Sequence, residues 1–533
     1  MTADELISIL LKNRGLDSPG LVEAFFHPPN PLDIPLSVVG LSESAVSSAI
    51  SVINQQLTTN NSIAIYGDYD VDGICSTAII WETLYGFTKS VFPYIPHRRE
   101  EGYGLTKTGI DRCLEKGARL IIVVDSGIVA GKAVDYCHSR GCQIIIIDHH
   151  EAGSEIPRAD AILHTTQTSA AGISWFFIRE FLKNRESSFL NHESELLTFA
   201  AISVICDLVP LLGINRSLAK WGLSQLNATA RPGLLALFSE AGLSPGGIGA
   251  YEVGFVIGPR LNAMGRLGHA LDSLRLLCTT DSQKAADLAK LLADTNRHRQ
   301  ELTQKSADHA LAQFDPLNLP GILMVADSQY DEGIVGLIAS KLVEKYYRPA
   351  IAVSVGAEVS KASARSVTGF HITEFLRQFP DILTSVGGHS MAAGFSVPTA
   401  KLNELKSRII EISRTAVPDR VLVRNQRIDA QIPAELLGLD LYLRLSDFAP
   451  FGLGNPRPVL MSFGMPVNFA RRIGTGARHL RFNASGLEAI YFNAPAGLEN
   501  DLTAADLTYQ LDSHTWNGRT NLQLIIRELK SAV

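Results

Sequence analysis

Three aspartates at alternate positions follow a short apolar run near residue 65, and this pattern constrains the chain most. Residues 62–73 read SIAIYGDYDVDG, and the run 63–66 is short enough to be a buried parallel strand. The three acids after it are Asp68, Asp70 and Asp72. Three like charges this close repel one another, but a hard divalent cation such as Mg²⁺ or Mn²⁺ would offset them. A solvated acidic turn is the alternative, and the pattern favours metal binding.

The following residues alternate apolar runs with helical segments, which is typical of a parallel sheet covered on both faces. We expect strands at 63–66, 120–124 and 144–147, and a proline-marked crossing near 92–96. Ligands on such sheets bind beyond the carboxyl ends of the strands. The second strand ends in Asp125, and the third ends in Asp148, His149 and His150.

Each of these strand ends has an ordinary explanation alone, because an Asp after a strand is often a cap or turn former. Together, five Asp and two His at one sheet edge would repel strongly without cations. Such a set is typical of a two-metal hydrolytic site.

Asp207 is a further acid within an apolar segment, AISVICDLVPLL at 201–212. A buried Asp is rare unless it is paired or binds metal. A capping or hydrogen-bonded Asp before Pro210 is the alternative, and the strand-end acids favour a metal ligand.

The chain has 533 residues, which suggests three or four domains. With a net charge of −6, contact with nucleic acid would depend on local basic patches. The six scattered cysteines lack zinc-site spacing and indicate free thiols in a reducing compartment. No apolar run is long enough to span a membrane and no signal peptide is evident, so we expect a cytoplasmic protein without membrane contact.

Two later segments have their own patterns. Residues 282–314 contain no Gly or Pro, and their apolar positions thin out after Asn296, which predicts one long helix bridging two domains; a helix packed on one domain is the alternative. Apolar runs at 322–326 and 351–354 then indicate a second, smaller α/β unit.

The final segment, 425–533, has short strands punctuated by Gly, which indicates a small β-barrel. Basic and aromatic side chains interleave there and suit phosphate contacts and base stacking with single-stranded nucleic acid. In the alternative interpretation, the aromatic residues form the barrel core. The candidate nucleic-acid-binding residues are Arg471, Arg472, Arg478, His479, Arg481 and Phe482.

Four motifs in order resemble those of the DHH phosphoesterase superfamily: YGDYDVDG (66–73), VDSGI (124–128), DHHE (148–151) and CDLVPL (206–211). Two more narrow the resemblance to RecJ-type single-strand-specific 5′→3′ exonucleases: PYIPHRREEGYGL (93–105) and IGPRLNAMGRLG (257–268). The resemblance continues through EGIVGLIASKLVEKYYRPA (332–350), KASARS (361–366), GGHSMAAGFS (387–396) and APFGLGNPRP (449–458).

The resemblance implies two divalent ions, Mn²⁺ or Mg²⁺, as cofactors. Asp125 would bridge the two ions, and Asp70 would bind the first of them. Asp72, His149 and Asp207 would bind the second.

Four more residues would act beside the ions. The resemblance implies that Asp68 and Asp148 are supporting acids, the latter orienting a ligand imidazole. His150 would donate a hydrogen bond or carry a proton at the scissile phosphate, and Arg98 would hold a phosphate oxygen.

The resemblance also implies a pocket for substrate phosphate in the second α/β unit, and residues lining the cleft between the two lobes. The pocket residues are Ser363, Arg365, Gly387, Gly388 and His389, and the cleft residues are Arg260, Asn262 and Arg266. The chain departs from the family pattern after DHHE and at His164, where Asn-Pro is usual, so the shape of 152–170 is left open.

We therefore expect an α/β protein with a parallel-sheet DHH domain, a smaller α/β DHH-associated domain and a C-terminal OB-fold barrel. The expected segments are 1–60 (helical), 61–281 (catalytic), 282–314 (connecting helix), 315–424 (DHH-associated) and 425–533 (barrel).

The leading hypothesis is a metal-dependent 5′→3′ exonuclease specific for single-stranded DNA, releasing 5′-mononucleotides in recombination and repair. A single-strand-binding protein and a helicase are candidate partners. The alternatives are a DHH enzyme acting on short RNA or small phosphorylated nucleotides, and a catalytically inactive DNA-binding scaffold.

Overall fold

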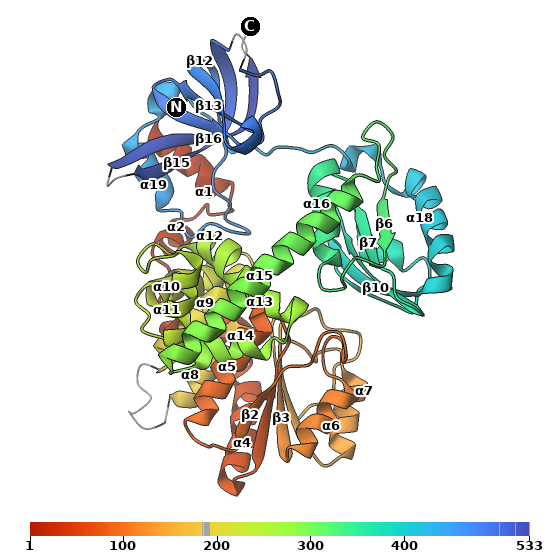
Figure 1. Cartoon of the computed structure of the whole chain (residues 1–533). Helices are drawn as coiled ribbons and strands as arrows, with labels where there is room; N and C mark the ends of the chain where they lie inside the picture. The colour runs from red at the N-terminus through yellow and green to blue at the C-terminus, as the bar shows by residue number, and fades with distance from the viewer. Residues whose placement is uncertain (184, 186–191, 500–501, 517–518, 532–533) are drawn as a thin grey trace.

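Figure 1 shows three folded bodies in the computed structural model, which describes residues 1–183, 185, 192–499, 502–516 and 519–531. The first body carries a parallel sheet and a helical bundle, and the long helix α15 leads from it to a second α/β body (Figure 1). The barrel lies above the helical bundle (Figure 1). Within the described part of the chain, every helix is too short or too polar to cross a bilayer.

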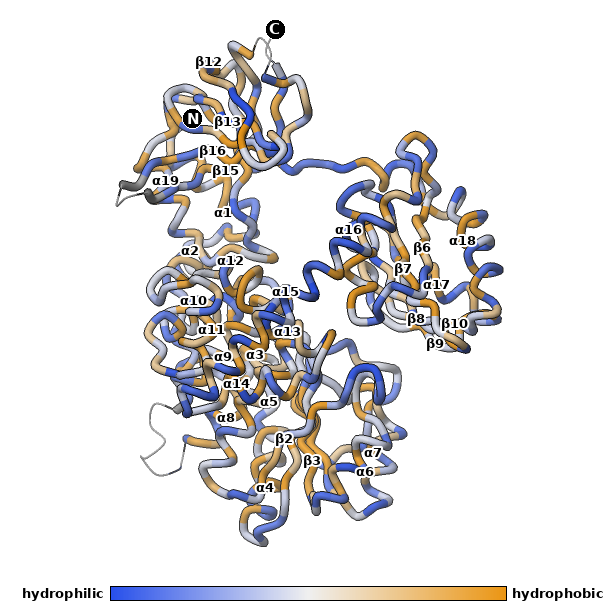
Figure 2. Tube along the Cα trace, in the orientation of Figure 1, coloured by the Kyte–Doolittle hydropathy of each residue, from blue (hydrophilic) through white to orange (hydrophobic). Residues whose placement is uncertain are grey.

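The first sheet is fully parallel, with strand order β2-β1-β3-β4-β5. Its strands are β1 (Ser62–Tyr66), β2 (Val91–Tyr94), β3 (Ala118–Val124), β4 (Gln143–Asp148) and β5 (Ala161–His164). Ile, Val and Leu fill both faces of the central strands, and Figure 2 shows this sheet as mainly hydrophobic. The predicted strands are confirmed, and the proline-marked crossing is itself the edge strand β2.

Helices cover both faces of this sheet. Those on one face are α4 (Glu43–Thr59), α5 (Val71–Tyr85) and α8 (Ala170–Leu182), and those on the other are α6 (Lys107–Glu115) and α7 (Gly131–Ser139). The bundle continues with α9 (His192–Cys206), α10 (Gly213–Asn227), α11 (Pro232–Ala241), α12 (Ala250–Glu252), η3 (Val253–Ile257), α13 (Gly258–Leu267) and α14 (Leu271–Cys278).

Helix α15 (Ser282–Leu311) is about 45 Å long by its rise per residue. Ala285 and Leu292 lie in the core of the first body, whereas Ala310 lies in the core of the second. The predicted bridging helix is therefore confirmed.

The second body has a mixed sheet with strand order β6-β7-β8-β10-β9. Its strands are β6 (Leu323–Asp327), β7 (Ala350–Ser354), β8 (Val359–Arg365), β9 (Ser385–Gly388) and β10 (Ala392–Pro398). The accompanying helices are α16 (Val335–Tyr346), α17 (Ile372–Leu376) and α18 (Leu402–Ala416).

The predicted C-terminal barrel is confirmed, because pairing of β12 with β15 closes the sheet β11-β12-β13-β14-β16-β15. Its elements are β11 (Ala430–Gln431), α19 (Leu439–Ser446), β12 (Leu460–Ile473), β13 (His479–Ala484), β14 (Leu487–Tyr491), β15 (Ala504–Trp516) and β16 (Arg519–Ser531).

Residues 1–60 divide between two cores. Helices α1 (Ala3–Lys12) and α2 (Pro19–Phe26) place Leu6 and Phe25 in the barrel core, which the sequence pattern did not indicate. Helix α3 (Leu36–Val39) and α4 pack in the core of the first body instead.

A buried arginine on α10 fixes the barrel to the first body. Arg216 is 1% exposed and lies over the Phe25 ring. Its guanidinium donates hydrogen bonds to the carbonyl oxygens of Phe25, Asp447, Phe448, Ala449 and Pro450. Nearby, the Leu211 N–H donates to the Leu453 carbonyl at 2.8 Å. The barrel thus contacts the loop that carries Asp207.

Candidate metal centre

The Asp68–Asp72 segment connects the end of β1 to the start of α5. Asp70 caps the helix, and its Oδ1 accepts from the N–H groups of Asp72 at 3.0 Å and Gly73 at 3.2 Å. A Cβ on Gly73 would lie 2.6 Å from the Asp68 backbone, so only glycine allows this close turn. The tight connection holds three carboxylates at the sheet edge.

Asp72 is held by hydrogen bonds from two other helices, α8 and α9. Its carboxylate accepts from the N–H groups of Ala170 and Ala171, both at 2.8 Å, at the start of α8. The Ser203 hydroxyl on α9 donates to it at 2.6 Å. A helix N-terminus stabilises a buried carboxylate in this position.

His149 faces three carboxylates. Its Nε2 lies 3.5 Å from Asp72 Oδ2, 3.4 Å from Asp125 Oδ1 and 3.6 Å from Asp207 Oδ2. These separations exceed an ordinary N–H···O hydrogen bond, and they match two ligands on one ion with bonds of about 2.1 Å. Asp72, His149 and Asp207 therefore form one candidate ligand group.

A second candidate group consists of Asp68, Asp70 and Asp125, whose donor atoms lie within 4.8 Å of one another. Asp68 Oδ1 is buried and has no hydrogen-bond partner in the described structure. Asp68 was expected only as a supporting acid, but this geometry makes it a candidate ligand. Asp125 contacts both groups and has a φ of 61°, a conformation that non-glycine residues rarely adopt.

Four carboxyls of the site, those of Asp68, Asp70, Asp125 and Asp207, resist ionisation without a cation. Burial raises the pKa of Asp68, Asp70 and Asp125, and neighbouring acids add to the shift. Burial followed by repulsion from Asp72 raises the pKa of Asp207 to about 9. Oxygen-rich ligands, one imidazole and an unpaired buried carboxylate oxygen fit two divalent ions such as Mn²⁺ or Mg²⁺.

Asp148 holds His150. Its Oδ1 accepts from His150 Nδ1 at 2.8 Å, and its Oδ2 accepts from the Ile128 N–H at 2.9 Å. The imidazole that Asp148 orients is that of His150, which lies with Asp125 and His149 in a further group able to hold an ion, whereas His149 gives Asp148 only a backbone N–H bond at 2.8 Å. Burial opposes protonation of His150, but Asp148 outweighs it and raises the pKa of His150.

Two residues that sequence reasoning missed also contact His150. The Tyr103 hydroxyl lies 3.1 Å from His150 Nε2. His164, where the sequence departs from the family pattern, donates from Nε2 to the His150 carbonyl at 2.7 Å. The altered segment therefore supports the DHH turn.

Four arginines gather between the two lobes near this centre. Burial and the neighbouring Arg98, Arg299 and Arg365 lower the pKa of Arg266 to about 10. None of the four forms an ion pair with a carboxylate in the described part of the chain. Unpaired guanidinium groups that repel one another are suited to phosphate oxygens. Arg299, on α15, gave no sequence signal of its own.

The three predicted cleft residues Arg260, Asn262 and Arg266 all lie on α13. Asn262 Oδ1 accepts from the Val71 N–H at 3.1 Å beside the metal centre. Arg266 donates to the Gly333 carbonyl of the second body at 3.1 Å, whereas Arg260 donates to the Val256 carbonyl of its own helix.

The predicted phosphate pocket lies on neighbouring strands of the second sheet. Arg365 donates to the Ser363 hydroxyl at 2.8 Å. Gly394 on β10 pairs with both Ser363 and Gly387, so the three lie side by side. Gly388 has a φ of 137°, and a Cβ there would lie 2.3 Å from the Ala392 oxygen. The His389 N–H donates to that same oxygen, closing the exposed turn.

The basic group on the barrel only partly matches the expectation. The prediction that Phe482 stacks on bases is wrong, because its side chain is 2% exposed and lies in the barrel core. Arg472 pairs with Glu499, and Arg481 pairs with Glu488. The remaining candidates Arg471 and Arg478 are exposed, and His479 is half-buried against Phe492.

Three family models match the chain. They are the DHH family N-terminal domain over residues 62–204, the DHHA1 domain over 319–415 and the RecJ OB domain over 428–528.

The curated relatives share the same description. The single-stranded-DNA-specific exonuclease RecJ of Bacillus subtilis is 33% identical over 541 residues, covering 98% of this chain and 67% of the relative. The same-named protein of Escherichia coli is 30% identical over 520 residues, covering 91% of this chain and 90% of the relative. Among solved structures, RecJ of Thermus thermophilus in complex with Mn²⁺ matches with a TM-score of 0.83 at 28% identity, covering 99% of this chain and 76% of that one.

Proposed function

Because the chain belongs to the RecJ family of single-stranded-DNA-specific exonucleases, we propose that it hydrolyses single-stranded DNA from the 5′ end and releases 5′-mononucleotides. The position of Asp125 between two candidate ligand groups is the observation that carries the proposal. The proposed ligands are Asp70, Asp72, Asp125, His149 and Asp207, and Asp68 joins them because of its unpaired oxygen.

Two divalent ions, Mn²⁺ or Mg²⁺, supply Lewis acidity when bound, which activates water and stabilises charge in the transition state. The protein contributes fixed groups around the scissile phosphate. His150, held by Asp148 and raised in pKa, donates a hydrogen bond or a proton to a phosphate oxygen. Arg98 and Arg266 bind the remaining phosphate oxygens and align the bond for attack.

Recognition of the chain end belongs to the second body. Ser363 and Arg365, with the glycine turn at 387–389, are proposed to bind the terminal 5′-phosphate. A phosphate held there, across the cleft from the ligands, limits cleavage to the end of a strand. His389 is exposed at the same turn and adds one imidazole donor.

A DHH enzyme for short RNA or small nucleotides is the second candidate. The closed barrel and its exposed Arg471 and Arg478 argue against it, because a very short substrate needs no extended binding surface. A catalytically inactive scaffold would have no use for so many buried acids.

The proposed domain boundaries are those expected from the sequence, 61–281, 282–314, 315–424 and 425–533, with residues 1–60 shared between two cores. We further propose that the protein is cytoplasmic and acts in recombination and repair. Its proposed partners are a single-strand-binding protein and a helicase.

The test compares substrates at equal concentration with Mn²⁺ or Mg²⁺: single-stranded DNA, matched RNA, duplex DNA and a dinucleotide. Of the three long substrates, we expect only single-stranded DNA to release mononucleotides rapidly. Faster turnover of RNA or of the dinucleotide would favour the second candidate. Binding of DNA without cleavage would favour the scaffold.

A further inference from the structure

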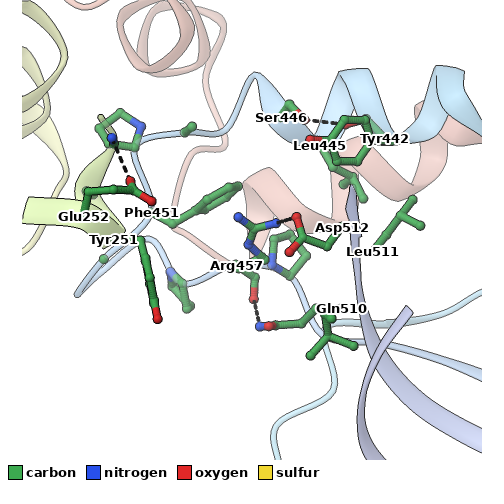
Figure 3. A pocket seen from close by; sticks show the side chains of 18 of the residues that line it. Tyr251, Glu252, Tyr442, Leu445, Ser446, Phe451, Arg457, Gln510, Leu511 and Asp512 are labelled. Atoms are coloured by element: carbon green, nitrogen blue, oxygen red, sulfur yellow. Dashed lines mark hydrogen bonds and ion pairs between the residues drawn. The ribbon is translucent and has the colours of Figure 1, made fainter. Parts of the chain in front are cut away.

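A groove of 1050 Å³ separates the helical bundle of the first body from the barrel. Helix residues Tyr251 and Phe255 line one side, and Phe451, Arg457 and Arg527 of the barrel region line the other. Figure 3 shows Tyr251 and Phe451 beside each other, with the Arg457–Asp512 pair beyond them. We call this set the aromatic groove. None of its residues belongs to the metal centre described above.

Two of its rings are stacked and open to solvent. Tyr251 and Phe255 have ring centroids 5.0 Å apart and an interplanar angle of 29°. Their side chains are 66% and 71% exposed, unusually high for large aromatic residues that already contact each other. They lie where the helix contains the π-turn η3, a deviation that often marks functional sites.

The barrel side offers groups that suit a nucleic acid strand. Arg527 is exposed and bonds to the neutral Gln510 amide at 2.7 Å, so its charge is not neutralised. Arg457 pairs with Asp512 at 2.8 Å, and Glu252 accepts from the Gly249 N–H of its own helix. Asp512 is therefore paired, whereas Glu252 keeps its charge. Because Lys220 also lines the groove, the charged side chains of the lining sum to a net positive charge.

The helix itself leads from the aromatic groove to the catalytic cleft. Elements α12, η3 and α13 form one continuous helix over residues 250–267. Phe255 precedes Asn262 by seven residues and Arg266 by eleven along this helix, so one element joins the aromatic groove to the cleft residues. Phe255 and Arg266 are about 16 Å apart along the axis by the rise per residue. A strand with bases stacked at 3.4 Å spans that distance with about five nucleotides, and an extended strand with fewer.

We propose that Tyr251 and Phe255 form a base-stacking site for single-stranded DNA, a few nucleotides on the 3′ side of the scissile bond. The strand runs along the 250–267 helix between the bundle and the barrel, with phosphates contacting Arg527. Stacking on exposed rings accepts any base, which is what an enzyme that degrades a strand of any sequence requires. The inference rests on the proposed single-strand exonuclease function and names where the substrate beyond the cleavage site is held.

The test uses oligonucleotides of about 12 nucleotides with 2-aminopurine at each of the first several positions in turn. In EDTA, where no cleavage occurs, we expect fluorescence quenching on binding at one or two internal positions of the strand. The double variant Tyr251→Ala/Phe255→Ala should lose this quenching and bind the oligonucleotide roughly 10-fold more weakly. Tyr251→Phe keeps an aromatic ring and should retain both signals.

A matched control is Tyr85→Ala, since Tyr85 is 40% exposed and pairs with Trp81 at 5.0 Å on α5, at the end remote from the metal centre. It should leave quenching and affinity unchanged. Turnover of a dinucleotide, too short to reach the groove, should be the same in the double variant as in the wild type.

Unchanged quenching and affinity in the double variant would overturn the stacking site. An equally large loss of dinucleotide turnover in the double variant would also overturn the stacking site, since the effect would then arise in the catalytic cleft. A wild-type protein that shows the quenching but never cleaves with Mn²⁺ would instead refute the proposed nuclease function and leave the stacking site intact.

Discussion

His149 Nε2 lies 3.4 Å from Asp125 Oδ1, although the two residues end different strands of the first sheet. The distance is too long for a strong hydrogen bond and suits two ligands on a common ion. Parallel neighbouring strands β3 and β4 bring the two side chains together at the carboxyl edge. The parallel order of the strands thus places two proposed metal ligands next to each other.

Asp125→Asn should abolish turnover, by at least about 1,000-fold, because Asp125 lies between both candidate ion positions. Steady-state nuclease assays with Mn²⁺ measure the loss. Affinity for single-stranded DNA in EDTA, followed by anisotropy, should stay within about twofold of the wild type. An equal loss of binding would contradict the proposed role.

Metal-free protein should lose stability as the pH rises. The folded state raises the pKa of Asp207 from 3.8 to about 9, so between these values it retains a proton that the unfolded chain releases. The contribution of Asp207 to stability is therefore fully present below about pH 4 and falls as the pH rises toward 9. Thermal unfolding in EDTA should show a lower midpoint at pH 8 than at pH 6.

Asp207→Asn should remove part of this pH dependence, and Mn²⁺ should raise the midpoint at pH 8 far more in the wild type than in this variant. A metal-free midpoint that increases from pH 6 to pH 8 would contradict the electrostatic account of the site.

Asp148→Asn should lower kcat by about 10- to 100-fold with little change in KM, because His150 loses its charged hydrogen-bond partner. The pKa of His150 should also fall, which shifts the basic limb of the pH–rate profile for kcat, where His150 loses its proton, to lower pH. Asp160→Asn is the matched control, since Asp160 contacts His138 at 3.0 Å away from the metal centre. Equal losses in both variants would mean that the effect is one of stability.

Arg216→Ala should destabilise the protein by about 3 kcal/mol or more, because several buried carbonyl groups lose their donor at once. Denaturant unfolding should then separate the barrel transition from that of the first body. Arg444→Ala, which removes an exposed ion pair with Asp4, should cost less than about 1 kcal/mol. A single, unshifted transition for Arg216→Ala would show that the barrel is held by other contacts.

The sheet and its ligand edge could be predicted because the period of apolar runs and the acids after each strand are local in the sequence. Partners that come from distant segments could not: the hydroxyl of Tyr103, the imidazole of His164 and the guanidinium of Arg299 have no pattern of their own.

The direction in which side chains point from strands and helices could not be predicted from the sequence either. Phe482 and Arg481 are adjacent on β13, and strand alternation turns one into the core and the other toward Glu488. Without the register of the barrel, the two directions were indistinguishable. Similarly, the apolar faces of α1 and α2 gave no sign that their partner is the barrel, more than 400 residues away in the sequence.

The most direct test of the central claim follows one single-stranded DNA carrying a label at either its 5′ or its 3′ end, with Mn²⁺ and with EDTA. With Mn²⁺, the 5′ label should appear at once as a mononucleotide while the 3′ label remains in progressively shorter strands. EDTA should stop both processes. Release that begins at the 3′ end, internal cuts, or equal release in EDTA would contradict a metal-dependent 5′→3′ exonuclease.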